Sequence, residues 1–366
     1  MLESITLQNF KSFGEEQIIP LEPITVLVGP NNSGKSNFMS VARFLKNSLV
    51  AGISAAAQQE GGLLLHVPPT GDNHCVIGWR MGDFQYSAKL SPAVSVLSER
   101  AFDTAGNTIE FDGTTTRAGT QVTTSLFQPN RDQFTFARSK LGVNTPIPVQ
   151  GLWAPFSNTR SIKLSLAALR ADSEVIPQPE IGQDGRGLAA VLGLWRGAMP
   201  EKAEALSGFL ARCLPEMKDV LVRPAPTPGH QRLWFRQKDG LEFDAEHVSD
   251  GVLAFTAMAM HALSAEKGQL LCIEEPEQSI HPKRLRELVD LLKDLVRERG
   301  CQFIIATHST VLLNAFRDET ETILLFRRSE TGTRVKRLSD VPELVEALQQ
   351  TPPGDLLETG AFSAAF

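Results

Sequence analysis

The residues with the clearest chemical potential lie between Val28 and Phe38, in the stretch VGPNNSGKSNF. Gly29, Gly34 and Lys35 followed by Ser36 have the spacing GxxxxGK[ST]. Backbone N–H groups in such a loop can surround a polyphosphate at the start of the next helix. The residues expected to contact the nucleotide are Gly29, Pro30, Asn31, Asn32, Ser33, Gly34, Lys35, Ser36 and Asn37.

Within this loop, Lys35 is expected to reach the β- and γ-phosphates and to act in catalysis, and the Ser36 hydroxyl is expected to bind Mg²⁺. A glycine-rich turn without nucleotide is the simpler alternative. An apolar strand predicted over residues 24–28 precedes the loop, and a helix predicted over 37–49 follows it. This context favours a nucleotide-binding P-loop over a plain turn.

Two adjacent carboxylates follow another apolar strand, predicted over residues 270–273 in GQLLCIEEPEQSIHP. A buried strand that ends in acids delivers them to the edge of a parallel sheet where ligands bind. Glu274 is therefore expected to hold Mg²⁺, and Glu275 to orient or deprotonate the attacking water. A solvated acidic turn is the alternative, which the P-loop earlier in the chain disfavours.

His308 follows a third apolar strand, predicted over residues 302–306 in CQFIIATHST. A lone histidine is commonly a core or surface residue without a catalytic role. If this strand is a neighbour of the acidic one in a parallel sheet, His308 can donate a hydrogen bond to a γ-phosphate. We therefore include it among the expected catalytic residues.

A capped, apolar helix is predicted over residues 252–263, in HVSDGVLAFTAMAMHAL. Ser249 and Asp250 are good N-cap residues, and Gly251 permits close approach of a backbone. The helix is apolar on nearly all sides, which predicts burial. Its N-terminus offers N–H groups and a positive dipole end to an anion, although an ordinary capped core helix has the same pattern.

The composition is that of a globular protein: 366 residues, 42% hydrophobic, 21% charged, with a net charge of -6. This charge argues against a surface devoted to nucleic acid. The four scattered cysteines have no metal-binding spacing. No apolar run is long enough to cross a membrane, and the N-terminus lacks the layout of a signal peptide. We therefore expect a cytoplasmic protein without a membrane partner.

The order of predicted elements indicates an α/β fold with a discontinuous nucleotide-binding core, residues 1–50 and 244–366, because the P-loop and the acids must share one sheet. Residues 51–160 are expected to form an antiparallel β-rich insertion that starts with a mobile connection over 51–60. Residues 161–243 are expected to form a helical lobe, starting with SIKLSLAALRA, and to end in returning strands.

Taken together, GPNNSGKS, VSDG, LLCIEEPEQSIHP and ATHS, in this order, resemble an ABC-type ATPase head of the RecF/SMC/OLD branch. The similarity is strongest to stand-alone predicted ATPases of the AAA-21-like group. The opening ITLQNFKSFG and the segment DGRGLAAVL also resemble this branch. The resemblance implies a P-loop NTPase fold, with the β-subdomain and helical lobe inserted between the P-loop and the signature motif, and ATP and Mg²⁺ as cofactors.

In that family the VSDG segment corresponds to the signature motif. The resemblance therefore implies that Ser249, Asp250 and Gly251 contact the γ-phosphate of ATP held by a second subunit in an ATP-sandwich homodimer. Glu274 stands where many relatives have aspartate, and VSDG and SIHP replace the transporter-like LSGGQ and ALD. The glutamine that normally joins the metal shell is not obvious, and Gln178 and Gln183 are the candidates.

Two functions are compatible with these motifs, and a third is not. The first is an ATP-driven clamp on DNA, as in repair or recombination, and the second is an ATP-gated scaffold for a protein effector in antiphage defence or a toxin–antitoxin-like system. The third, an OLD-type nuclease, needs clustered acids after the histidine strand, and the 58 residues that follow His308 instead predict a β-hairpin. A solvated edge strand is the more common role of such a basic run, but these residues of the hairpin could also contact phosphates: Arg327, Arg328, Arg334, Lys336 and Arg337.

Overall fold

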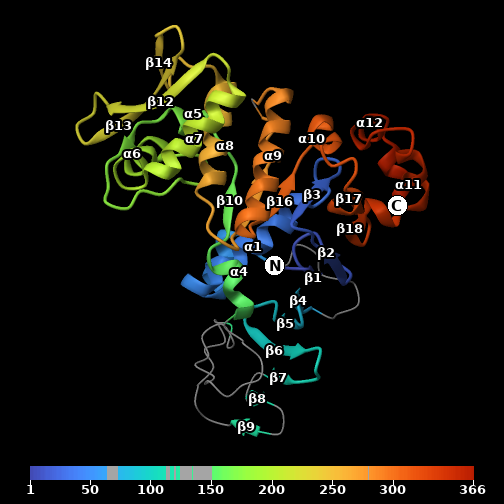
Figure 1. The fold of residues 1–366 in the computed structure, drawn as a ribbon. Coiled ribbons are helices and arrows are strands. Elements are labelled where there is room, and N and C mark those ends of the chain that lie inside the picture. The colour runs from blue at the N-terminus through green and yellow to red at the C-terminus, as the bar shows by residue number, and fades with distance from the viewer. Residues whose placement is uncertain (64–72, 113–115, 119–120, 124–133, 135–150, 279) are drawn as a thin grey trace.

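The computed structural model describes the chain except residues 64–72, 113–115, 119–120, 124–133, 135–150 and 279. The described strands form three sheets (Figure 1). An eight-stranded sheet and a small four-stranded sheet extend from opposite sides of a six-stranded one, which carries the predicted nucleotide loop at the end of a central strand.

The six-stranded sheet has the order β10-β15-β16-β3-β17-β18, and its strands are parallel except for the β17–β18 pair. The strands are β10 (Arg160–Ile162), β15 (Leu270–Glu274), β16 (Gln302–Ala306), β3 (Ile24–Val28), β17 (Ile323–Ser329) and β18 (Gly332–Arg337). Because β15, β16 and β3 are consecutive neighbours, the residues that follow them meet at one edge. The β17–β18 pair confirms the predicted hairpin.

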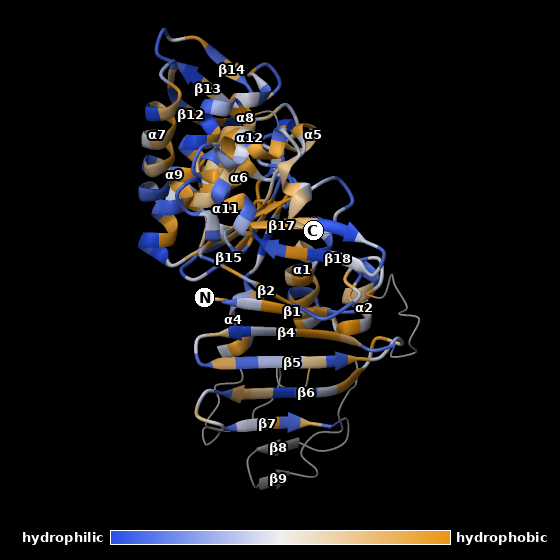
Figure 2. Cartoon of the chain, turned by 90° about the vertical axis from the view of Figure 1, so that its right-hand side faces the viewer, coloured by the Kyte–Doolittle hydropathy of each residue, from blue (hydrophilic) through white to orange (hydrophobic). Residues whose placement is uncertain are grey.

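The larger sheet is an antiparallel ladder in the order β2-β1-β4-β5-β6-β7-β8-β9 (Figure 2). It contains β1 (Ser4–Gln8), β2 (Gln17–Pro20), β4 (Cys75–Met81), β5 (Phe84–Leu90), β6 (Val96–Asp103), β7 (Thr108–Phe111), β8 (Thr116–Ala118) and β9 (Gln121–Thr123). The N-terminal strands therefore begin the ladder that the insertion continues. Parts of the predicted β-rich insertion lie outside the described residues.

The third sheet contains β11 (Ser173–Glu174), β13 (His230–Gln237), β12 (Met217–Pro224) and β14 (Glu242–Asp244). Helices α6 (Leu188–Ala198) and α7 (Pro200–Cys213) pack against this sheet, and α5 (Leu166–Arg170) packs against α8 (Asp250–Leu263). The predicted helix start SIKLSLAALRA is partly wrong, because its first residues form β10, which pairs with β15, and only α5 is helical.

Helices cover both faces of the six-stranded sheet. Side chains alternate along β3, so that Val26 and Val28 join one core cluster and Leu27 the other. The first cluster includes α8 (Asp250–Leu263) and α9 (Pro282–Arg299), and the second includes α1 (Lys35–Ala51) and the large sheet. All four cysteines are buried and free.

The remaining helices are short. Within the segment 51–60, where the sequence predicts a mobile connection, residues 53–59 form helix α2 with Ile53, Ala56 and Ala57 buried. The other segments are α4 (Ala154–Ser157), α10 (Thr310–Asn314), α11 (Pro342–Leu348), α12 (Pro353–Glu358) and the 3₁₀ turns η1 (Gly151–Trp153), η2 (Thr320–Thr322), η3 (Leu338–Asp340) and η4 (Ala361–Ala365). Within the described part of the chain, no helix combines the length and apolarity needed to cross a membrane.

Candidate functional site

The predicted nucleotide loop runs from β3 to the start of α1, the strand–loop–helix context that its spacing requires. Gly29 and Gly34 have φ of 156° and 106°. A Cβ on Gly29 would lie 2.2 Å from the Phe326 carbonyl oxygen, and one on Gly34 would lie 2.2 Å from Thr333 Oγ1. Both glycines are thus required by the hairpin β17–β18, which packs directly behind the loop.

The hairpin also holds the loop by hydrogen bonds. Thr333 Oγ1 donates to the Ser33 carbonyl oxygen at 3.0 Å and lies 2.8 Å from Ser12 Oγ. Asn31, Asn32 and Ser36 are exposed on the outer side of the loop. The side of the loop that faces the hairpin is therefore held by hydrogen bonds, and the opposite side is open to solvent.

Lys35 is folded over the loop that it follows. Its ammonium donates to the carbonyl oxygens of Gly29 at 2.6 Å and Pro30 at 3.0 Å. Burial lowers the pKa of Lys35 to about 8, and the negative charges of Glu275 and Glu277 oppose this shift. The cation is held among carbonyl oxygens, from which it can transfer to phosphate oxygens of a bound ligand.

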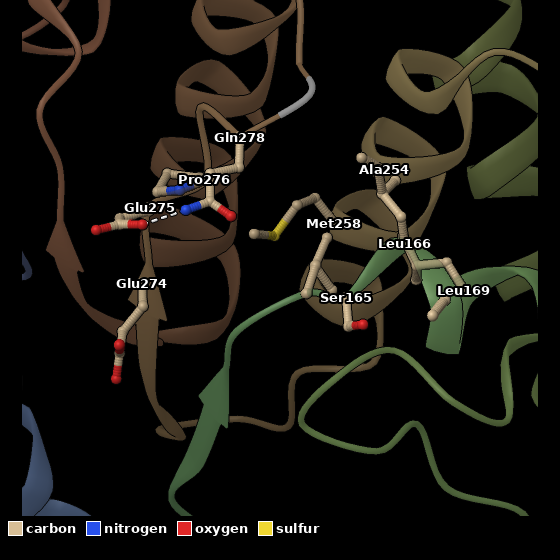
Figure 3. A pocket seen from close by; sticks show the side chains of 11 residues that line it. Ser165, Leu166, Leu169, Ala254, Met258, Glu274, Glu275, Pro276 and Gln278 are labelled. Atoms are coloured by element: carbon tan, nitrogen blue, oxygen red, sulfur yellow. Dashed lines mark hydrogen bonds between the residues drawn. The ribbon is translucent and has the colours of Figure 1, made fainter.

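The two predicted acids occupy the end of β15 and point in different directions (Figure 3). Glu275 has a φ of 49°, in the left-handed region that residues other than glycine rarely adopt. The Gln278 side-chain amide donates to Glu275 Oε2. Glu275 and Gln278 border a cavity of about 400 Å³, whose other walls include Leu166 of α5 and Met258 of α8.

Glu274 is buried and held by two cations that sequence reasoning missed. Arg43 Nη1 of α1 lies 3.3 Å from Glu274 Oε1, and Lys163 Nζ lies 3.1 Å from Oε2. Arg43 comes from two turns beyond the P-loop, and Lys163 comes directly after the short strand β10. No spacing in the sequence relates these three positions, since only the sheet order joins them.

The donor set suits Mg²⁺, because hydroxyl and carboxylate oxygens are its preferred protein ligands. Ser36 is exposed at the start of α1, and the Lys163 ammonium shows that the Glu274 carboxylate accepts a cation at Oε2. Ser36 and Glu274 are the residues that would hold the ion. When bound with ATP, the ion would neutralise charge on the phosphate oxygens.

His308 follows β16, one strand away from the acids and one from the P-loop. Its backbone N–H donates to Glu277 Oε1 at 2.6 Å, and the Thr307 hydroxyl donates to Glu277 Oε2 at 2.9 Å. The pKa of His308 is lowered by burial and by the charge of Lys35, so the ring is neutral near pH 7. A neutral imidazole can donate one hydrogen bond to an anion. Sequence reasoning missed Glu277, although the motif EEPE contains it.

A second cavity, of about 410 Å³, lies beside the P-loop. It is lined by Gly29, Pro30 and His308 on one side and by C-terminal residues such as Phe362 and Phe366 on the other. The C-terminal segment is attached to the hairpin because Arg327 Nη1 donates to the Ser363 carbonyl oxygen at 2.8 Å.

The predicted signature segment begins α8, whose residues from Leu253 to Leu263 are buried. Ser249 occupies the N-cap position with extended backbone, but its side chain makes no capping hydrogen bond, contrary to expectation. Asp250 is paired with Arg170 of α5. Ser249 and Asp250 are exposed, so the first turn of α8 faces solvent.

The two candidate glutamines lie in the segment between β11 and α6, and both are exposed. The Gln183 carbonyl oxygen accepts the backbone N–H of Lys163 at 2.9 Å. Gln183 therefore lies beside the segment that reaches Glu274, but among the described contacts the group that touches this carboxylate from that side is the Lys163 ammonium.

The family described as "AAA domain, putative AbiEii toxin, Type IV TA system" matches residues 24–314, most of the chain. The chain belongs to this AAA_21 family. A second AAA domain family matches residues 4–42.

Among curated proteins, the OLD nuclease of Thermus scotoductus is 20% identical over 342 residues, which cover 87% of this chain and 61% of that protein. The chain thus spans about three fifths of that relative. Structural maintenance of chromosomes protein 1B of Homo sapiens is 38% identical over 60 residues, covering 16% of this chain and 5% of the human protein.

Among solved structures, an SMC head bound to the C-terminal winged-helix domain of ScpA has a TM-score of 0.52 at 14% identity, covering 92% of this chain and 97% of that one. This similarity establishes the fold. The predicted fold class is confirmed: the chain is a P-loop, ABC-type ATPase head of the RecF/SMC/OLD branch.

Proposed function

We propose that this chain binds and hydrolyses ATP with Mg²⁺, with Lys35 on the β- and γ-phosphates, Glu275 on the attacking water and His308 on the γ-phosphate. The observation that supports this most directly is the sheet order β15-β16-β3, which brings the acids, the histidine and the P-loop to one edge. Phosphoryl transfer depends mainly on positioning and charge stabilisation, which such an edge can supply.

We further propose that two heads enclose ATP between them, with Ser249 and Gly251 of one head facing the γ-phosphate in the other. The exposed first turn of α8 supports this. A helix of 14 residues with an open N-terminus presents N–H groups and a positive dipole end to an anion. The P-loop follows β3 of the six-stranded sheet, whereas the N-terminus of α8 follows β14 of the small sheet, and we propose the second subunit as the source of the ligand for α8.

The ATP-bound dimer is proposed to gate a protein effector, as in antiphage defence or toxin–antitoxin-like systems, in the cytoplasm. The net charge of -6 supports a protein partner over DNA. The basic hairpin is also partly neutralised, since Arg334 pairs with Glu15 and Arg337 with Glu22. A DNA clamp of the RecF/SMC kind is the second candidate, supported by the SMC-head fold.

The test of ATPase function uses two substitutions in the P-loop and acid pair. Lys35→Ala removes the ammonium, so the affinity for ATP should fall. Glu275→Gln keeps the shape but cannot accept a proton, so ATP should bind while turnover falls about a hundredfold or more. Fluorescent-nucleotide binding and phosphate release measure the two effects. Wild-type turnover by Glu275→Gln would refute the assignment of Glu275.

A further inference from the structure

A row of five alternating charges, which ends at the exposed Lys163 side chain, lies beside the acid pair. Lys11 Nζ lies 3.4 Å from Glu60 Oε2, and Arg43 Nε lies 3.1 Å from Glu60 Oε1. Arg43 and Lys163 then hold the two oxygens of Glu274 at 3.3 and 3.1 Å. Through two buried carboxylates, this row of charges thus joins the N-terminal segment, α2, α1, β15 and the end of β10.

The two cations on Glu274 are held very differently. The Arg43 side chain is 24% exposed, belongs to α1 and also binds both oxygens of Glu60. The Lys163 side chain is 59% exposed, and among the described residues Glu274 is the only group that its ammonium contacts. A flexible four-carbon stem in solvent costs little to move. The Lys163 ammonium can therefore dissociate from Glu274, whereas the Arg43 guanidinium remains bound to it.

We propose that Lys163 competes with Mg²⁺ for Glu274 Oε2 and thereby sets the Mg²⁺ concentration at which the nucleotide site is completed. This inference rests on the proposed ATP function. Both cations need the same carboxylate lone pairs, and the divalent ion has the stronger attraction at that distance. Arg43 holds Oε1 in both states, so the carboxylate keeps its orientation when Lys163 is displaced. Without nucleotide, Lys163 keeps this buried acid paired.

The experiment measures Mg²⁺ dependence without turnover. Glu275→Gln protein with a fixed amount of N-methylanthraniloyl-ATP is titrated with Mg²⁺, and the half-saturating concentration is read from fluorescence. Lys163→Met and Lys163→Gln remove the competing charge, so this concentration should fall by up to about fivefold, the upper end expected for an ion pair that is partly exposed to solvent. Lys163→Arg should not lower it.

The matched control is Lys46→Met, because the Lys46 ammonium binds the Thr159 carbonyl oxygen next to β10 but not Glu274. It should leave the half-saturating concentration unchanged. An equal or higher value in folded Lys163→Met and Lys163→Gln would overturn the competition. If the Lys163 variants give that result while the unsubstituted protein still binds the nucleotide through Lys35, only the inference about Lys163 fails. If no nucleotide binds at all, the proposed function itself fails.

Discussion

At the scale of residues, carboxylates and an amide hold the proposed catalytic groups in place. Glu277 accepts two hydrogen bonds from the end of β16, and Gln278 holds Glu275. Glu275 itself has a left-handed backbone, which costs free energy and persists only when its surroundings fix it. The acid loop 274–278 therefore positions both its own acid and the histidine of the next strand.

Replacement of Glu277 tests this positioning role. In Glu277→Ala the His308 N–H and the Thr307 hydroxyl lose their acceptor, so His308 should no longer be fixed toward the phosphate. We expect turnover to fall about tenfold or more while the affinity for ATP changes less than twofold, because one misplaced group affects the transition state most. Steady-state ATPase rates measure the turnover, and equilibrium nucleotide binding measures the affinity for ATP.

The conservative variant distinguishes positioning from general destabilisation. Glu277→Gln keeps an oxygen for the His308 N–H, so it should recover much of the lost turnover at an unchanged melting temperature. Equal losses in Glu277→Ala and Glu277→Gln, or losses that track the melting temperature, would show that Glu277 is only structural.

At the scale of elements, the strands and helices that carry motifs were predictable and the short ones were not. The strands before the P-loop, the acids and His308 are continuous apolar runs, and their bounds agree with the sequence to within one residue. Strand β10 has three residues and is stabilised by pairing with β15, which no local pattern reveals. Lys163 was missed for that reason.

The same limit applies to the site partners. The carboxylates at strand ends can be predicted from the local sequence pattern. Nothing in the local sequence marks Arg43, which pairs with Glu60 only because α2 folds beside it. Residues 51–60 are small and polar, yet they form α2 because Ile53, Ala56 and Ala57 pack into the core. Because tertiary packing determines where these elements form, the row of alternating charges could not be predicted from the sequence alone.

Helix α8 carries a buried histidine that its neighbours do not satisfy. His261 is 1% exposed, and neither ring nitrogen has a hydrogen-bond partner among the described residues. Burial, with a smaller effect from Arg160, lowers the pKa of His261 to about 3. The ordinary value is about 6.5, so between pH 6.5 and 3 the unfolded chain binds a proton that the native state does not. This group therefore destabilises the fold as the pH falls through that window.

His261→Leu removes both the unpaired buried ring nitrogens and the group whose pKa is lowered by burial. We expect the free energy of unfolding to rise by about 1 kcal/mol at pH 7.5, because an unpaired buried polar group is removed. The advantage over wild type should grow as the pH is lowered below 6.5, by at most about 1.4 kcal/mol per pH unit. Urea unfolding at pH 7.5 and 5.5 measures it. Met260→Leu, buried on the same helix, should show a difference that does not change with pH; a pH-independent effect in His261→Leu would contradict the burial argument.

At the scale of the whole molecule, one short segment connects the acid pair to the signature segment. Lys163 contacts Glu274, Arg170 contacts Asp250, and Asp172 binds Arg232 of β13 through two hydrogen bonds. The cavity beside Glu275 and Gln278 separates this segment from the acid loop (Figure 3). Residues 163–172 therefore contact both Glu274 and Asp250, the first residue of α8.

If that turn acts on ATP in the other subunit, two inactive proteins should restore each other. Lys35→Ala has a defective P-loop and an intact signature segment, whereas Ser249→Arg has the reverse. A mixed dimer contains one complete site, formed by the P-loop of the Ser249→Arg chain and the signature of the Lys35→Ala chain. The introduced arginine then faces the nucleotide site that Lys35→Ala has already disabled.

We expect each variant alone to have little ATPase activity and an equimolar mixture to recover up to about one quarter of the wild-type rate per chain, because half of the dimers are mixed and each has one of two sites. Phosphate release over a series of mixing ratios measures this, and the recovery should be greatest near equal amounts. A double variant carrying both changes, mixed with either single variant, is the control and should recover nothing. Activity that equals the average of the separate proteins at every ratio would mean that Ser249 acts within its own head, and the ATP-sandwich proposal would then be wrong.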